Sequence, residues 1–339
     1  MRHKTEGENQ MKKLVAVAFI AAIALCCIFA QGAGETETAK WPDGNVNVIV
    51  PAAPGGGTDL VARKFAEVAN RVTGKNFIVV NQGDGGGAVA YDTVYHDDED
   101  GLNLGLFIPS FFTTYISGQV NENPMTDYKI ACYVDRITAH YIVARSDAPY
   151  KTYEEMVDYI KAHPGEVTFG TSIGSRSHYK MVEWAKAAGL EFKWVEAGKT
   201  AKAITSLLGG HIDVTTFDAA NAKSYAESGD VILFCASDEP LERLDFNKDV
   251  RTWAQLGYTE LRCQDPVLMV CGKNVPDSTV KQINEMMVQV YSDPELIEYM
   301  RANGSALKPY DYEQSKELYE ACFKVYDEVG EDLGVKAAR

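Results

Sequence analysis

The stretch Val46-Asn-Val-Ile-Val-Pro-Ala-Ala-Pro-Gly-Gly-Gly-Thr-Asp59 joins a short apolar run to a triple glycine and then to a helical pattern. We expect a strand at 46–50, a loop, and a helix from Asp59 to Val72 with Thr58 as its N-cap. Glycine permits a tight turn and a close approach of a ligand. The first N–H groups of a helix have no partner within it and favour negative charge. The loop is therefore predicted to bind an anion.

Two later segments repeat this strand, loop and helix arrangement. The apolar run Phe77–Asn81 passes through Gly83-Asp-Gly-Gly-Gly87 into a helical pattern, and Val167–Thr171 passes through Ser172-Ile-Gly-Ser-Arg-Ser-His178 into another. A segment rich in hydroxyl groups that starts at Ser110 also follows an expected strand. Open parallel sheets bind ligands at the carboxyl ends of their strands. We therefore expect these loops to contribute to one shared site.

Expected strands and helices alternate along the whole chain, which is typical of an α/β protein with parallel sheets. Its 339 residues allow about two domains. We predict two lobes with a ligand cleft between them. Residues 41–143 together with 264–339 form lobe 1, and residues 144–263 form lobe 2. The crossings between the lobes are expected to act as a hinge.

The N-terminus predicts export. Lys12-Lys13 precedes an apolar run at Leu14–Phe29 and then small residues, which is the pattern of a secretory signal, so residues 1–34 are assigned to a signal peptide and leader. A transmembrane anchor is the alternative, because the apolar run approaches the length that spans a bilayer. We expect a periplasmic or extracytoplasmic protein. Met1 and Met11 both remain possible starts.

The cysteines do not decide whether the protein carries a lipid anchor. Cys26 and Cys27 offer a site for a lipid anchor after cleavage, but Leu25 stands where a small residue is expected. Five cysteines remain in the mature chain, an odd number without paired close spacing. Neither a disulfide framework nor a zinc site is therefore indicated, and buried thiols are expected.

Charge and motifs exclude several classes of function. The chain has 33 Lys and Arg against 48 Asp and Glu, a net charge of -15, without a basic cluster outside the N-terminus. Nucleic acid is therefore not an expected partner. The histidines lack ligand spacing, so no metal is predicted. No cofactor is predicted either, since Gly198-Lys-Thr200 has Lys193 where a phosphate-binding loop needs glycine.

One motif indicates a hydrolase. Gly170-Thr-Ser-Ile-Gly174 matches the G-x-S-x-G turn between a strand and a helix, with Ser172 as the nucleophile. That fold needs an acid and then a histidine later in the chain, and only His178 and His211 follow Ser172. A secreted serine hydrolase is therefore the alternative to a binding protein that is not an enzyme.

Arg176 lies between Ser175 and Ser177 at an expected helix start. A guanidinium there adds two directed donors to the free N–H groups of the helix. Its alternative role is an ion pair with a surface carboxylate.

Together these segments resemble the substrate-binding proteins of tripartite tricarboxylate transporters, the Bug family of periplasmic receptors. The likeness covers most of the mature chain. It rests on Val48–Asp59 followed by Ala62-Arg63, Val79-Val-Asn81 with its glycine loop, Asp100-Gly-Leu-Asn-Leu104, Phe169–His178, and Leu207-Leu-Gly-Gly-His-Ile-Asp-Val214. The resemblance implies a two-lobed type II periplasmic binding fold, which closes on a small carboxylate and delivers it to a membrane permease. We expect the protein to be a monomer.

The loops and the resemblance imply a ligand site. We assign to it Ala52, Ala53, Gly55, Gly56, Gly57, Thr58, Asp84, Gly85, Gly86, Ser110, Ser172, Ser175, Arg176, Ser177, His178, Ala197 and Asp218. Backbone N–H groups of the first loop are expected to bind a carboxylate directly or through water, so that Gly56→Val abolishes binding. Asp84 and Glu196 depart from the family pattern and add acidic groups near the site. They favour a dicarboxylate or an amino acid over a tricarboxylate such as citrate.

Overall fold

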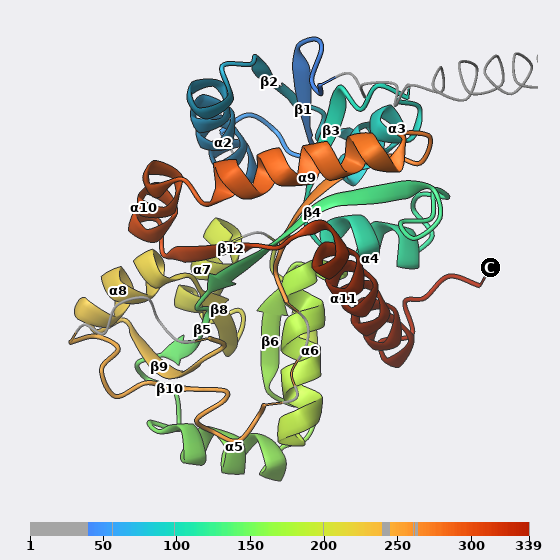
Figure 1. Cartoon of the computed structure of the whole chain (residues 1–339). Helices are drawn as coiled ribbons and strands as arrows, with labels where there is room; N and C mark the ends of the chain where they lie inside the picture. The colour runs from blue at the N-terminus through green and yellow to red at the C-terminus, as the bar shows by residue number, and fades with distance from the viewer. Residues whose placement is uncertain are drawn as a thin grey trace, which may run out of the picture. The chain divides into compact units, whose positions relative to one another are not determined.

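The computed structural model describes residues 40–338 apart from 56, 98, 199, 239–244, 260, 262 and 263 (Figure 1). The signal segment, its cysteines, Gly56 and Cys263 lie outside the described residues. Within the unit that starts at Trp41, the described residues build two six-stranded sheets. The protein is therefore of the α/β class, as predicted.

The first sheet has the strand order β12-β4-β11-β3-β1-β2. β1 pairs in parallel with β2 and β3, whereas β11 and β12 run antiparallel to β4. β1 is almost wholly buried, as expected for a parallel strand whose sheet is covered on both faces. The strands are β1 Val46–Val50, β2 Phe77–Asn81, β3 Asn103–Phe107, β4 Tyr128–Thr138, β11 Val267–Gly272 and β12 Ser305–Pro309.

Helices cover both faces of this sheet. Apolar side chains of α2, α9 and α10 form one core with it, and those of α3, α4 and α11 form another. The helices are α2 Gly57–Thr73, α3 Ala88–Tyr95, α4 Ser110–Ile116, α9 Asp277–Tyr291, α10 Pro294–Ala302 and α11 Tyr312–Asp332, with a short 3-10 turn η1 at Asp84–Gly87. Within the described part of the chain, no helix is both long and apolar enough to cross a membrane.

The second sheet has the order β10-β9-β5-β8-β6-β7, with β6 parallel to β7 and β8. Helices α5 and α6 pack on one face, and α7 and α8 pack on the other. The elements are β5 Tyr141–Arg145, α5 Tyr153–Ala162, β6 Thr168–Thr171, α6 Arg176–Ala188, β7 Lys193–Glu196, α7 Thr200–Leu208, β8 Val214–Phe217, α8 Ala219–Glu227, β9 Val231–Ala236 and β10 Arg251–Thr252.

The chain crosses between the sheets twice. It leaves the first sheet after Thr138 and joins the second at Tyr141, because β5 pairs along its length with β8 and β9. Tyr141–Val143 therefore pair with the second sheet, although the expected boundary placed them in lobe 1. The chain returns between β10 and β11, and Asp265 lies on this returning segment.

Some local predictions differ from the structure. Thr58 is not an N-cap, since α2 begins one residue earlier at Gly57. The helix α4 was not predicted, because its seven residues span only about two turns, too few to show a clear helical period. The short strand β12 was not predicted either. Four cysteines are buried free thiols, as expected: Cys132, Cys235, Cys271 and Cys322.

Candidate functional site

The first two predicted loops pack directly against each other. They follow β1 and β2, which are neighbours, so both leave the same edge of the sheet. The Asn81 side chain donates a hydrogen bond to the Ala52 carbonyl (3.2 Å). A Cβ atom on Gly83 would lie 2.8 Å from the nitrogen of Ala53, so only glycine fits between the two backbones. The structure therefore brings Ala52 and Ala53 beside the second glycine loop.

Asp59, in the first turn of α2, holds the first loop and is only 1% exposed. Its Oδ2 atom accepts hydrogen bonds from the Gly55 N–H (2.8 Å) and the Arg63 Nε–H (2.9 Å), and its Oδ1 atom accepts one from Asn81 (2.8 Å). Burial raises the pKa of Asp59, but these hydrogen bonds outweigh it and hold the pKa below its ordinary value. The Gly55 N–H, which was predicted to bind the ligand, is thus already bonded to a carboxylate of the helix that follows the loop.

The second loop turns through three consecutive glycines with positive φ: Gly85 (60°), Gly86 (71°) and Gly87 (101°). Glycine adopts this conformation readily, whereas other residues do so at a cost. Asp84, Gly85 and Gly86 are exposed. This loop therefore presents backbone groups and the carboxylate of Asp84 to solvent.

Two helix starts accompany these loops. Gly57 and Thr58 lie in the first turn of α2, where N–H groups have no partner within the helix. Ser110 is the first residue of α4, which follows β3, the other neighbour of β1. Its carbonyl accepts a hydrogen bond from the Thr114 hydroxyl (2.6 Å). The predicted residues of the first sheet therefore lie in loops and helix starts that follow the carboxyl ends of three neighbouring parallel strands.

In the second sheet, the loop between β6 and α6 is folded by its own polar groups. Ser175 caps α6, because its hydroxyl accepts the N–H of His178 (3.3 Å). The His178 ring accepts the Gly174 N–H at Nδ1 (3.1 Å) and packs edge-on against Trp194, with 5.0 Å between ring centroids. The His178 side chain is buried, and burial lowers its pKa to about 4. His178 is therefore a neutral residue that shapes the loop.

This geometry does not make His178 a base for Ser172. A serine nucleophile needs an imidazole nitrogen that can accept its proton. Nδ1 of His178 already accepts the Gly174 N–H, and Nε2 is buried without a hydrogen-bond partner among the described residues. The Ser172 carbonyl accepts the Ser175 N–H (3.1 Å) and so contributes to the turn. The part of the chain that the structure describes also has no group of three side chains suited to hold a metal.

Glu196 connects two loops of the second sheet. It ends β7 and is exposed. Its Oε2 atom accepts the N–H of Ile173 (2.7 Å), and its Oε1 atom accepts the N–H of Gly198 (2.8 Å). The Glu196 carboxylate therefore accepts two backbone N–H groups at the carboxyl ends of β6 and β7, where a ligand site was predicted.

The last two predicted residues have structural roles. Asp218 caps α8 by accepting the N–H (2.9 Å) and the side-chain amide (2.8 Å) of Asn221. Ala197 donates its N–H to the Thr171 carbonyl (2.9 Å), and its methyl group is buried in the core. The N–H of Ala197 is therefore already in use, although the residue lines a cavity beside Glu196 and Gly198.

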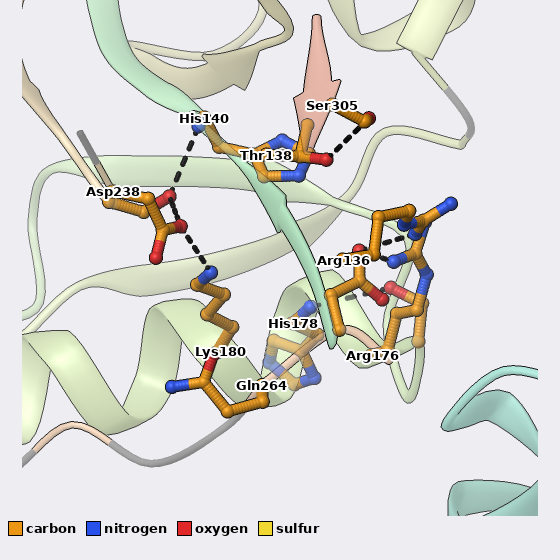
Figure 2. Close-up of polar contacts among 12 residues, drawn as sticks. Arg136, Thr138, His140, Arg176, His178, Lys180, Asp238, Gln264 and Ser305 are labelled. Carbon is orange, nitrogen blue, oxygen red and sulfur yellow. Dashed lines mark hydrogen bonds and ion pairs between the residues drawn. The ribbon is translucent and has the colours of Figure 1, made fainter. Parts of the chain in front are cut away.

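A charged group that we did not predict lies at the crossings between the sheets (Figure 2). Arg136 on β4 places Nη2 2.7 Å from Oδ2 of Asp265, and Arg176 on α6 contacts the same oxygen with Nη1. Burial lowers the pKa of Arg176 to about 9 and that of Arg136 to about 10, so both remain charged at neutral pH. Arg176 therefore pairs with a buried carboxylate rather than with the surface carboxylate of the alternative role.

A second ion pair lies beside this group, as Figure 2 shows. Lys180 Nζ lies 2.8 Å from Oδ2 of Asp238, which also accepts the Ser237 hydroxyl (2.7 Å). Burial, followed by the charges of Lys180 and the arginines, lowers the pKa of His140 to about 3. Ser177 lines a small pocket together with His140 and Lys180. Three cations thus share two carboxylates, and the histidine among them is neutral.

The sequence contains one signal for this group. Arg136 follows the apolar stretch Ile130–Val134, and Asp265 shortly precedes the apolar strand β11. Val267 pairs with Val134 across the antiparallel strands, and continuing that register places Asp265 opposite Arg136. Opposite charges at facing positions attract each other. The pair could be found only once the two strands were known to be neighbours.

Acid is expected to destabilise the protein through His178. The folded-state pKa is about 4 against an ordinary 6.5, so between these values the unfolded state binds more protons and stability falls as pH falls. The loss from pH 7 to pH 4 should be on the order of 2 to 3 kcal/mol. Denaturant unfolding at pH 7 and pH 4 measures this loss in wild type and in His178→Asn. The amide oxygen of the asparagine can still accept the Gly174 N–H. Since His140 titrates in both proteins, an equal loss in the two would contradict a contribution from His178.

Comparisons with known proteins agree with this architecture. Residues 61–324 match the family model described as tripartite tricarboxylate transporter family receptor. A protein of Cupriavidus necator, the UPF0065 protein in gbd 5'region, is 25% identical over 289 residues, which cover 84% of this chain and 86% of that protein. The solved structure of the periplasmic binding protein BugD is 25% identical with a TM-score of 0.67, covering 87% of this chain and 99% of BugD. R. palustris Rpa4515 with adipate is 19% identical with a TM-score of 0.70, covering 87% and 99%.

Proposed function

The chain belongs to the family of tripartite tricarboxylate transporter receptors, and from this premise we propose that it captures a small carboxylate and delivers it to a membrane permease. Receptors of this family are periplasmic solute-binding proteins, which indicates an extracytoplasmic location. We further propose that the two sheets are the cores of two lobes that close on the ligand. The crossings near Ala139 and Asp265 would then form the hinge.

The packing of the two glycine loops in the first sheet supports this proposal most directly. Gly83 separates their backbones, and Gly85 and Gly86 expose a left-handed turn to solvent. Such a turn can direct successive backbone N–H groups toward an anion. A carboxylate could be bound there without a positively charged side chain, and Gly57 and Thr58 would add the free N–H groups at the start of α2.

The ligand class follows from the charges around the loops. Asp84 is exposed on the second loop, and Glu196 is exposed at the end of β7. An additional carboxylate near either of them would be repelled. We therefore propose a dicarboxylate or an amino acid rather than a tricarboxylate, and the adipate in Rpa4515 is a dicarboxylate.

A thermal-shift screen followed by calorimetry tests the proposal. The panel contains succinate, malate, adipate, citrate, aspartate, glutamate and neutral amino acids. A bound ligand at about 100 times its dissociation constant should add roughly 2.7 kcal/mol to stability. Stronger stabilisation by citrate than by any dicarboxylate or amino acid would overturn the proposed ligand class. No stabilisation by any member would count against the proposed function itself.

A further inference from the structure

The second sheet already contains a bound carboxylate, which is its own Glu196. The two backbone donors come from different loops, because Ile173 follows β6 and Gly198 follows β7. β6 and β7 are parallel neighbours, so their carboxyl ends meet at one edge of the sheet. Each N–H donates to a separate oxygen of Glu196, at 2.7 and 2.8 Å. A ligand carboxylate would be held in the same way, by two backbone donors on its two oxygens.

Other donors nearby are also in use. The N–H of Ala197 is bonded to Thr171, and the N–H of Gly174 is bonded to His178. A ligand carboxylate that binds to the N–H groups of Ile173 and Gly198 must therefore displace Glu196 from them. An ammonium or uncharged group does not compete for these donors, because the exposed Glu196 can accept further hydrogen bonds from it.

We propose that Glu196 replaces a ligand carboxylate in this receptor and is its specificity-determining residue. The inference rests on the proposed capture of a small carboxylate and revises its ligand class, because it replaces the dicarboxylate option: one end of the ligand carries a carboxylate for the glycine loops of the first sheet. The end that faces Glu196 carries an ammonium or an uncharged group. The ligand class is therefore an amino acid or a monocarboxylate rather than a dicarboxylate.

Matched ligands test this assignment. Calorimetry compares succinate with 4-aminobutanoate, glutarate with 5-aminopentanoate, and adipate with 6-aminohexanoate, with aspartate and alanine added as α-amino acids. Wild type should bind the ligands with an ammonium group at least tenfold more tightly than the dicarboxylates. In Glu196→Ala the N–H groups of Ile173 and Gly198 become free, so this preference should fall by at least tenfold. Glu196→Gln retains one acceptor oxygen, so its preference for ligands with an ammonium group should lie between those of wild type and Glu196→Ala.

Glu191→Gln is the control, because Glu191 is exposed and lies just before β7, at the other end of that strand. It removes the same charge and should keep the wild-type preference, and melting temperatures show whether each variant is folded. A wild-type preference for dicarboxylates, or a preference that folded Glu196→Ala and Glu196→Gln leave unchanged, would overturn the role of Glu196. Absence of binding by wild type to every ligand of both panels would overturn the proposed function and this inference with it.

Discussion

Replacing Asp265 with alanine is expected to lower the free energy of unfolding by about 3 to 5 kcal/mol. Asp265 is 7% exposed, and its Oδ2 atom is the shared partner of Arg136 and Arg176. Without it, two partly buried guanidinium groups, whose side chains are 13% and 26% exposed, face each other with no carboxylate between them. Urea unfolding of wild type and variant measures the loss, and an unchanged m-value would show that the change lies in stability.

Asp147→Ala is the matched control for this prediction. Asp147 forms an ion pair of similar length with Arg145 (2.8 Å), but its side chain is 69% exposed, so solvent replaces the lost partner. The urea midpoint of this variant should stay close to that of wild type. Adding Arg136→Met to Asp265→Ala should restore part of the stability, because it removes one of the two unpaired charges. A loss for Asp265→Ala no larger than for Asp147→Ala would contradict a buried network at the crossings.

Asp59→Ala should cost about 2 kcal/mol of stability and weaken ligand binding by at least tenfold. The carboxylate accepts hydrogen bonds from the Gly55 N–H, the Asn81 amide and the Arg63 guanidinium, and the first two donors cost about 1 kcal/mol or more each when they are left unpaired, whereas water replaces the partner of the exposed Arg63. The first loop would lose its attachment to α2. Denaturant unfolding measures the first effect, and calorimetry with a ligand from the panel measures the second.

The variant Arg63→Met distinguishes the contribution of the loop hydrogen bonds of Asp59 from that of its ion pair with Arg63. The Arg63 side chain is 54% exposed, so its pair with Asp59 should be worth less than about 1 kcal/mol. This variant should retain most of the stability and the affinity, since Gly55 and Asn81 still bind Asp59. Equal losses in Arg63→Met and Asp59→Ala would show that the ion pair, and not the loop hydrogen bonds, is the important contact.

Much of the local structure could be predicted, because its causes lie within a few residues. The strands Val46–Val50 and Phe77–Asn81 have the predicted bounds, since apolar runs and glycine turns mark their ends. The start of α2 was wrong by two residues. There the side chain of Asp59, and not that of Thr58, meets a free N–H group of the turn. The helix α4 was not predicted, because seven residues are too few to show a clear helical period.

The candidate site also has a part that the sequence predicts and a part that only the tertiary structure reveals. The sequence by itself located the glycine loops, because a glycine run after an apolar strand is a local signal of a donor-rich turn. Only the tertiary structure decided which donors are already in use. Glu196 accepts the N–H of Ile173, 23 residues away, because β6 and β7 are neighbours, and Arg136 meets Asp265 across 129 residues because β4 and β11 pair. Such pairs depend on strand order and register, which are set by packing of the whole sheet and not by neighbours along the chain.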